Sequence, residues 1–339
     1  MKYLATALMI FSLCIATPVM AAAPSGTVTI HVTPAVEAEA AELKLWIPYP
    51  LSDKSQTISD ATITGNHSTS GIYRDPASEA VYLHAAWTKP VEEPRLTLSF
   101  HITQADRSQT IGHDTGAPFP VEVARYLEST PFVPADSMEM KRIAGIATQG
   151  KSGTLEKARG VYDWVVDNTF RDPAVKGCGL AEPSRTLNAC KGGGKCADLS
   201  AVFVTIARAA GIPARDVYGL RLSTPKEGDI TSAFHCWAEF YLPVTGWVMV
   251  DPADVRKMML VHNLELKDAG DWREFFWAGD NLFRVTLEKD ARGVVFHGDS
   301  PLTPLNYFMY PQAKVDGVPL NQFDPKAFSY NVSFKADKG

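Results

Sequence analysis

The spacing of apolar residues changes twice along this 339-residue chain, and these changes restrict its fold more than any other feature. Near both ends, apolar and polar side chains alternate with a period of two, which predicts strands with one buried face. These predicted strands are residues 27–32, 43–47, 80–85, 95–102, 283–287 and 328–334. Between them, residues 154–168 and 196–210 carry apolar side chains at three- and four-residue steps, which predicts helices. Strands near both ends and helices in the middle favour an α+β fold.

Turn-forming residues divide the chain into segments. Gly, Pro and Asp are frequent at residues 112–120, where the strand pattern stops and the helical signals begin. We therefore expect an N-terminal β-sandwich at residues 24–110, a mixed core at 118–260 and a C-terminal β extension at 261–339. Within the core, further strands are predicted at residues 214–221, 233–242 and 246–250.

Composition excludes two classes of protein. Hydrophobic residues make up 45% of the chain and charged residues 21%, so packed cores are expected and global disorder is not. The formal net charge is −5, which provides no basic surface for nucleic acid.

The N-terminus has the features of a secretory signal peptide at residues 1–22. Lys2 is followed by a short apolar run at residues 4–15, and small residues follow at Ala21 to Ala23, where cleavage is expected. Later apolar runs fall short of the roughly 18 residues that a membrane span needs. We therefore expect an exported protein, in the periplasm or secreted, with no membrane span after cleavage.

Cys196 stands where a glycine-rich loop meets a predicted helix. Three glycines, residues 192–194, precede it, and the helical pattern begins at the cysteine itself. Unpaired N–H groups and the helix dipole favour negative charge at such a position, which lowers the pKa of a thiol and makes it a nucleophile. The loop also resembles a phosphate-binding loop, but Ala189 and Cys196 break that motif.

His235 lies in a predicted strand downstream of this helix. A period of two places His235, Trp237 and Glu239 on one face and the apolar Cys236 on the other. A histidine on the polar face of a core strand is suited to act as a general base for a cysteine. Cys236 is interpreted as a buried core thiol rather than a second nucleophile.

Asp251 ends the apolar strand that follows the histidine strand. A carboxylate there can accept the second imidazole N–H, fix the tautomer and stabilise the imidazolium. The Asp251-Pro252 pair is also typical of an ordinary turn. Asp254 is the fallback for the orienting role.

Four segments between residues 120 and 255 form one pattern when taken together. They are GGKCADLSAVFV at 193–204, ARAAGIPAR at 207–215, HCWAE at 235–239 and GWVMVDP at 246–252. This pattern resembles the bacterial transglutaminase-like superfamily, which includes cysteine proteases and transglutaminases. The resemblance implies a papain-like fold with the cysteine on a helix and the histidine and aspartate on adjacent antiparallel strands. It assigns the nucleophile to Cys196, the base to His235 and the orienting carboxylate to Asp251.

Some family features are missing from the sequence. The stretch before the nucleophile contains no glutamine for the oxyanion hole, so the second oxyanion donor stays open, with Asn188 as a candidate. The calcium used by animal transglutaminases has no matching loop here, and neither a cofactor nor a metal is predicted.

Four cysteines remain after the expected cleavage, and an exported protein favours their pairing. If Cys196 stays free, Cys178 and Cys190 are the natural pair, although the sequence does not decide whether they bond. No C-x-x-C is present and the spacings match no zinc template. A redox role for Cys190 and Cys196 is disfavoured for the same reason.

These features predict a thiol-dependent acyl-transfer enzyme that acts on amide bonds of peptides or proteins, including substrates linked to peptidoglycan. Hydrolysis by a protease or amidase is favoured over transamidation, by analogy of fold. The alternative is a catalytically silent scaffold or binding module in the cell envelope.

Overall fold

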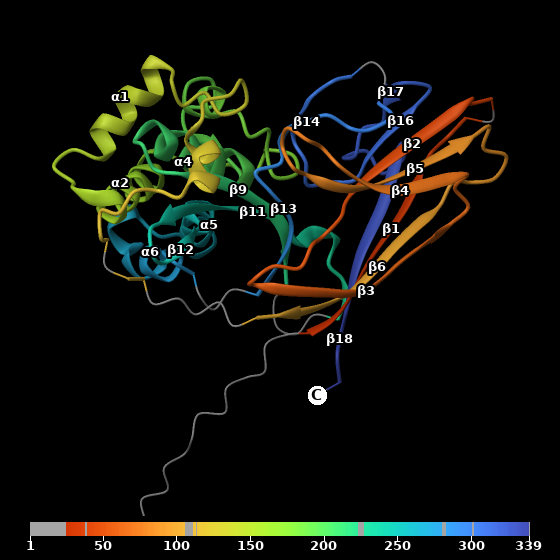
Figure 1. Cartoon of the computed structure of the whole chain (residues 1–339), viewed down its shortest axis with the longest axis horizontal. Helices are drawn as coiled ribbons and strands as arrows, with labels where there is room; N and C mark the ends of the chain where they lie inside the picture. The colour runs from red at the N-terminus through yellow and green to blue at the C-terminus, as the bar shows by residue number, and fades with distance from the viewer. Residues whose placement is uncertain are drawn as a thin grey trace, which may run out of the picture.

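The computed structural model describes residues 25–37, 39–105, 111–112, 114–222, 227–279, 283–299 and 302–338. A β-sandwich lies beside a unit of helices packed on a four-stranded sheet (Figure 1). This arrangement confirms the α+β fold. The predicted signal peptide lies outside the described residues. No helix in the described ranges is long and apolar enough to cross a membrane.

Strands from both ends of the chain form the sandwich together. The first sheet has the order β10-β18-β1-β6-β3 and the second β17-β16-β2-β5-β4. The first comprises β1 (Ser25–Pro34), β3 (Gln56–Gly65), β6 (Leu96–Gln104), β10 (Gly228–Asp229) and β18 (Phe328–Ala336). The second comprises β2 (Glu42–Pro48), β4 (Thr69–Arg74), β5 (Val81–Thr88), β16 (Gln312–Val315) and β17 (Val318–Pro319).

Antiparallel pairing explains the alternation seen in the sequence. Ile30 of β1 lies opposite Leu98 of β6 on one side and Val332 of β18 on the other, and all three are buried. Such cross-strand neighbours on one face give the sandwich its core. The C-terminal strand is therefore a structural part of the N-terminal sheet.

The second unit consists of helices and the sheet β12-β11-β9-β13. Its strands are β9 (Ala214–Arg221), β11 (Phe234–Leu242), β12 (Gly246–Val250) and β13 (Arg284–Lys289). Its helices are α1 (Met138–Ala147), α2 (Gly153–Asn168), α3 (Pro183–Leu187), α4 (Cys196–Ala209), α5 (Pro252–His262) and α6 (Gly270–Phe275). Helix α4 is buried along nearly its whole length and packs against β11.

Short elements complete the chain. Two two-stranded sheets pair β7 (Phe170–Arg171) with β8 (Gly193–Gly194) and β14 (Arg292–Val294) with β15 (Leu305–Tyr307). Short 3₁₀ helices are η1 (Val121–Leu127), η2 (Thr231–Ala233) and η3 (Leu266–Asp268).

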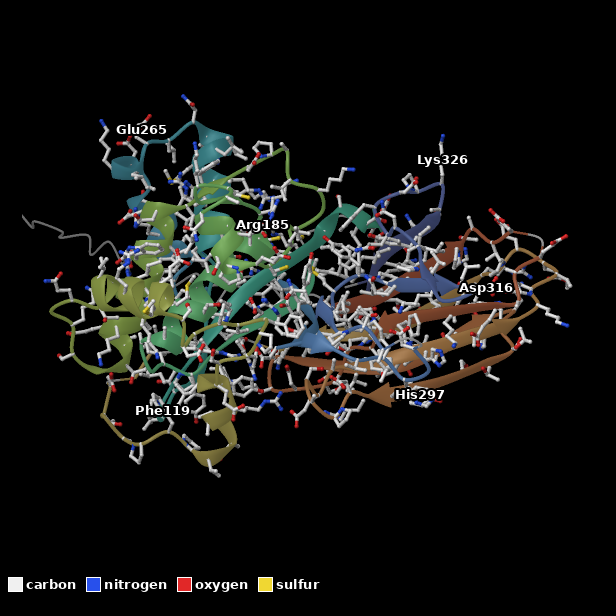
Figure 2. The ribbon with its side chains drawn as sticks, turned by 90° about the horizontal axis from the view of Figure 1, so that it is seen from above. Phe119, Arg185, Glu265, His297, Asp316 and Lys326 are labelled. Atoms are coloured by element: carbon white, nitrogen blue, oxygen red, sulfur yellow. The ribbon has the colours of Figure 1, made fainter. Side chains whose placement is uncertain are left out.

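The two units meet around the start of β11. The connection from β9 to β11 contributes β10, which pairs with β18 of the sandwich. Seen from above, Arg185 and Glu265 mark the helical unit, whereas His297 and Asp316 mark the sandwich (Figure 2). One buried apolar cluster runs from the sandwich to the first turn of α4. The start of β11, which carries His235, is thus held from both sides.

Four of the described helices were not predicted from the periodicity, namely α1, α3, α5 and α6. Helix α5 begins after Asp251, whose side chain accepts a hydrogen bond from the Asp254 backbone N–H at 2.9 Å. Pro252 occupies the first helical position, where its missing N–H costs nothing. The Asp-Pro pair is therefore a helix N-cap rather than an isolated turn. Helix α6 lies in a region expected to contain only β structure.

Candidate active site

Cys196 is the first residue of α4, as the glycine loop predicted. The loop is fixed because β8, which contains two of the glycines, pairs in parallel with β7. The side chain points inward and only 2% of the residue is exposed. The N-terminal end of a 14-residue helix therefore faces the thiol.

The Cys196 thiol is the most acidic of three neighbouring thiols. Burial alone raises its pKa, but hydrogen bonds from Cys178 and Cys236 and the adjacent His235 outweigh burial and hold the pKa well below its ordinary value. Hydrogen bonding to Cys196 raises the pKa of Cys178, and burial raises that of Cys236.

His235 is the second residue of β11 and is fully buried. Its Nε2 lies 2.6 Å from Oδ2 of Asp251, which is also fully buried. With Nε2 bonded to a carboxylate, the imidazole ring is held in one orientation. The face of β11 that carries His235 and Trp237 is buried, in contrast to the polar face that its residue types predicted.

The structure brings Asp251 to His235, and its side chain is held at both oxygens. Oδ2 contacts the imidazole and Oδ1 caps helix α5. Burial alone raises the pKa of Asp251, but the positive charges of His235 and Arg284 outweigh burial and hold the pKa well below its ordinary value. The carboxylate is therefore ionised and oriented, as the supporting member of a triad must be.

Arg284 was missed in the sequence, although it is part of the site. It lies on β13, is 1% exposed, and its Nη2 is 2.7 Å from Asp251 Oδ2. Its guanidinium also lies over the Trp237 ring, 4.9 Å from the ring centre. An arginine within a predicted strand of alternating apolar residues is a signal that could have been noticed. The sequence did not show, however, which carboxylate the arginine pairs with.

Arg221 is the second arginine that the sequence did not reveal. Its Nη2 lies 2.8 Å from His235 Nδ1, and the same side chain pairs with Asp254. Asp254 Oδ2 is 3.5 Å from His235 Nε2, farther than Asp251, so the fallback carboxylate is the weaker partner. Because the Arg221 side chain is 24% exposed, it forms the solvent side of the histidine site.

Cys178 and Cys190, the pair whose bonding the sequence left undecided, form no disulfide in the structure. All four cysteines that the structure describes are free thiols. The reason is that the Cys178 backbone is bound to the start of α4, where its C=O accepts from Ala197 N–H at 2.9 Å. Cys178 is consequently buried beside Cys196, whereas Cys190 is half-buried in the turn after α3.

Asn188 does not suit the role of oxyanion donor. Its side chain is exposed and donates to Glu139 of α1 at 2.9 Å. Asp198 lies in the first turn of α4, and both of its carboxylate oxygens accept backbone hydrogen bonds. One oxygen accepts from Leu180 and Ala181 N–H groups at 2.9 and 3.0 Å, and the other from Lys195 N–H at 3.0 Å. Asp198 thus ties the Cys178 loop to the helix.

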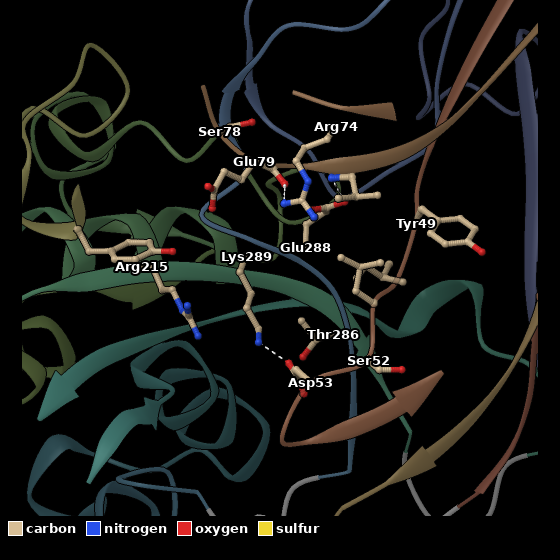
Figure 3. A pocket seen from close by; sticks show the side chains of 14 residues that line it. Tyr49, Ser52, Asp53, Arg74, Ser78, Glu79, Arg215, Thr286, Glu288 and Lys289 are labelled. Atoms are coloured by element: carbon tan, nitrogen blue, oxygen red, sulfur yellow. Dashed lines mark hydrogen bonds and ion pairs between the residues drawn. The ribbon is translucent and has the colours of Figure 1, made fainter. Parts of the chain in front are cut away.

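A cavity of about 260 Å³ lies elsewhere, between the sandwich and the core sheet (Figure 3). It includes the buried Glu288, whose Oε1 accepts from Val81 N–H at 3.1 Å, and the ion pair of Lys289 with Asp53. None of Cys196, His235 and Asp251 lines this cavity. It is therefore separate from the triad.

Comparison with known proteins follows this geometry. The family model of the transglutaminase-like superfamily matches residues 141–252, which contain Cys196, His235 and Asp251. An uncharacterised protein of Haemophilus influenzae is 32% identical over 87% of this chain and 86% of its own length. The structure of a candidate cysteine protease from Cytophaga hutchinsonii matches 93% of this chain and 99% of that chain, with 15% identity and a TM-score of 0.53. The periplasmic domain of TgpA from Pseudomonas aeruginosa matches 73% of this chain and 92% of that chain, with 14% identity and a TM-score of 0.36.

Proposed function

Because the chain belongs to the transglutaminase-like superfamily, we propose that it is an exported thiol enzyme that transfers acyl groups from peptide or protein amides. The observation that supports this most directly is the buried assembly of Cys196, His235 and Asp251, with the thiol at a helix N-terminus and the imidazole 2.6 Å from the carboxylate.

In the proposed reaction, the Cys196 thiolate attacks the amide carbonyl carbon and forms a tetrahedral oxyanion. The helix N-terminus, including the Cys196 backbone N–H, is placed to stabilise that charge. His235 then gives its proton to the departing amine, and a thioester remains on Cys196. Asp251 keeps the imidazole oriented throughout.

Water is the proposed acceptor of the acyl group, which makes the enzyme a protease or amidase. Hydrolysis needs no second binding site, whereas transamidation needs a site that holds an amine and excludes water.

Export is proposed on the signal-like N-terminus alone. Sequencing the N-terminus of the secreted protein would test it, with cleavage expected near Ala21 to Ala23.

The second candidate is a catalytically silent scaffold, and one observation favours it. Cys196 is 2% exposed, while His235 and Asp251 are fully buried, so a substrate can reach the thiol only if covering segments move. Accessible reactivity of Cys196 in solution therefore separates the two candidates.

The first test measures alkylation of Cys196 by iodoacetamide at pH 7, with the site identified by mass spectrometry. The enzyme proposal expects Cys196 to react faster than free cysteine, and His235→Ala or Asp251→Asn to slow the reaction at least tenfold. Cys190→Ser is the matched control and should react at the wild-type rate, while circular dichroism confirms that each variant is folded. Alkylation no faster than free cysteine and indifferent to His235→Ala would favour the scaffold.

The second test identifies the acceptor. Wild type and Cys196→Ala are incubated with cell-envelope extract, with and without a labelled primary amine. New amino termini that depend on Cys196 support hydrolysis, whereas Cys196-dependent incorporation of the label would show transamidation instead.

A further inference from the structure

Three buried sulfur atoms meet at one point beside the triad. Cys178 comes from the loop before α3, Cys196 from the start of α4 and Cys236 from β11. Their Sγ atoms all lie within 4.8 Å of one another, and the residues are 6%, 2% and 0% exposed. Met309 Sδ is a fourth sulfur, 3.5 Å from Cys236 Sγ. Thiols brought together in this way form a potential ligand set for a metal ion.

The three thiols are held in place by the backbone around them. The Ala197 N–H donates to the Cys178 C=O, and Asp198 fixes the two residues that follow Gly179. On the other side, Cys178 Sγ lies 3.5 Å from the C=O of Phe234, two residues before Cys236. The sulfur positions are therefore set before any ligand binds, which lowers the entropic cost of binding.

The separation of the sulfurs suits a three-coordinate ion. With a metal–sulfur bond of about 2.3 Å, three sulfurs around a planar centre stand about 4.0 Å apart. Sulfurs within 4.8 Å of one another reach that geometry by small side-chain rotations. A disulfide would use two of the thiols and leave the third unexplained.

The chemistry of the donors favours a soft ion. His235 belongs to a separate group with Asp251 and Asp254, so the thiol group contains sulfur alone. Zinc is usually held by four tetrahedral ligands, whereas thiolate and thioether sulfur selects Cu(I). The positive charge of Arg221 interacts with the Cys196 thiolate and offsets part of the negative charge of a metal–thiolate group.

We propose that Cys178, Cys196 and Cys236 form a three-thiolate site for a monovalent soft ion of the Cu(I) class. Cys178 and Cys236 each form a copper–sulfur bond and release a proton to solvent, whereas Cys196 binds as a thiolate, so the copper stays monovalent and no sulfur is oxidised. The bound ion occupies the same sulfur that serves as the nucleophile. Loading therefore blocks alkylation of Cys196, and on the proposed function it also blocks catalysis.

Titration with Cu(I) tests the site directly. Reduced full-length protein is kept free of oxygen and competes with the chromogenic Cu(I) chelator bicinchoninate. We expect one copper per chain, and Cys178→Ser and Cys236→Ser should each weaken binding by more than the roughly 10- to 100-fold effect of losing an outer-shell partner. Cys190→Ser, the matched control outside the group, should bind like wild type. X-ray absorption of the loaded protein should show sulfur as the only first-shell ligand.

Three results would overturn the site. They are a failure to withdraw copper from the chelator, equal loss of binding in Cys190→Ser, and nitrogen or oxygen among the first-shell ligands. A chain whose mass is lower by two hydrogens and that binds no copper would also overturn the site, because that mass loss shows a disulfide between two of the thiols. Thermal melting of each apo variant shows whether a loss of binding is a loss of folding.

The same experiment separates this site from the proposed enzyme. Copper binding with the expected cysteine dependence, together with an unreactive Cys196 in the apo protein, would retain the metal site and reject the enzyme. A reactive, His235-dependent Cys196 in a protein that binds no copper would do the reverse.

Discussion

Replacing Arg284 by methionine tests whether the buried charges behind the triad stabilise the fold. Methionine keeps much of the apolar length but removes the charge that pairs with Asp251 at 2.7 Å and lies over Trp237. Breaking a buried ion pair from one side costs about 3–5 kcal/mol, because it leaves the partner charge uncompensated. A domain is typically stable by only about 5–15 kcal/mol, so this loss is a large share of the total.

The loss should depend on pH in a defined direction. Burial favours the neutral form of Asp251, but His235 and Arg284 reverse this and hold its pKa below the ordinary value. A depressed carboxyl pKa adds stability above the unfolded-state pKa of about 3.9, and that stability is lost as the pH falls through the folded-state pKa. Arg284→Met raises the pKa of Asp251, so its penalty should be largest near neutral pH and shrink as the pH falls through the raised pKa of Asp251 in the variant.

Urea denaturation at pH 7.5 and at pH 3.5 measures both effects. Arg95→Met is the matched control, since the Arg95 side chain is 55% exposed and its nearest acid, Glu92, is 3.9 Å away. Its cost should be within about 0.5 kcal/mol. The reasoning is refuted if Arg284→Met costs no more than this control, or if its cost is the same at the two pH values.

Two further substitutions probe burial and backbone geometry. Burial raises the pKa of Glu288 well above its ordinary value, so the wild type loses stability as the pH rises above about 4.3. In thermal melts, the stability of Glu288→Gln relative to wild type should therefore increase from pH 4 to pH 8. A difference that is equal at pH 4 and pH 8 would contradict this. Gly179 has φ +102°, and an added Cβ would lie 1.9 Å from Asp198 Oδ2, whereas Gly211 has φ +78° and open space around it. In urea denaturation, Gly211→Ala should therefore lower the free energy of unfolding only by the strain of positive φ, about 1–3 kcal/mol. Gly179→Ala should lower it clearly more. Similar losses in the two variants would show that the Cys178 loop can move to accommodate the added methyl group.

Several strands and helices were well predicted, because a strand or helix that buries one face has apolar residues at regular intervals in its sequence. The strand at residues 214–221 and the strand at 246–250 have the predicted limits, and α4 begins at Cys196. Helix α5 was missed, since its start depends on a cap by Asp251, a residue that was assigned to the imidazole alone. A single side chain serves both roles, and a linear pattern shows only one.

The sequence by itself determined the longer strands of both units, helices α2 and α4, and the order of cysteine, histidine and aspartate along the chain. Only the tertiary structure decided which side chains meet. It placed Arg284 of β13 on Asp251, joined the C-terminal strand to the first one, and brought Cys178 to Cys196 and Cys236 rather than to Cys190. The physical reason is that periodicity reports whether a side chain is buried, whereas contacts between distant segments depend on how sheets and helices pack.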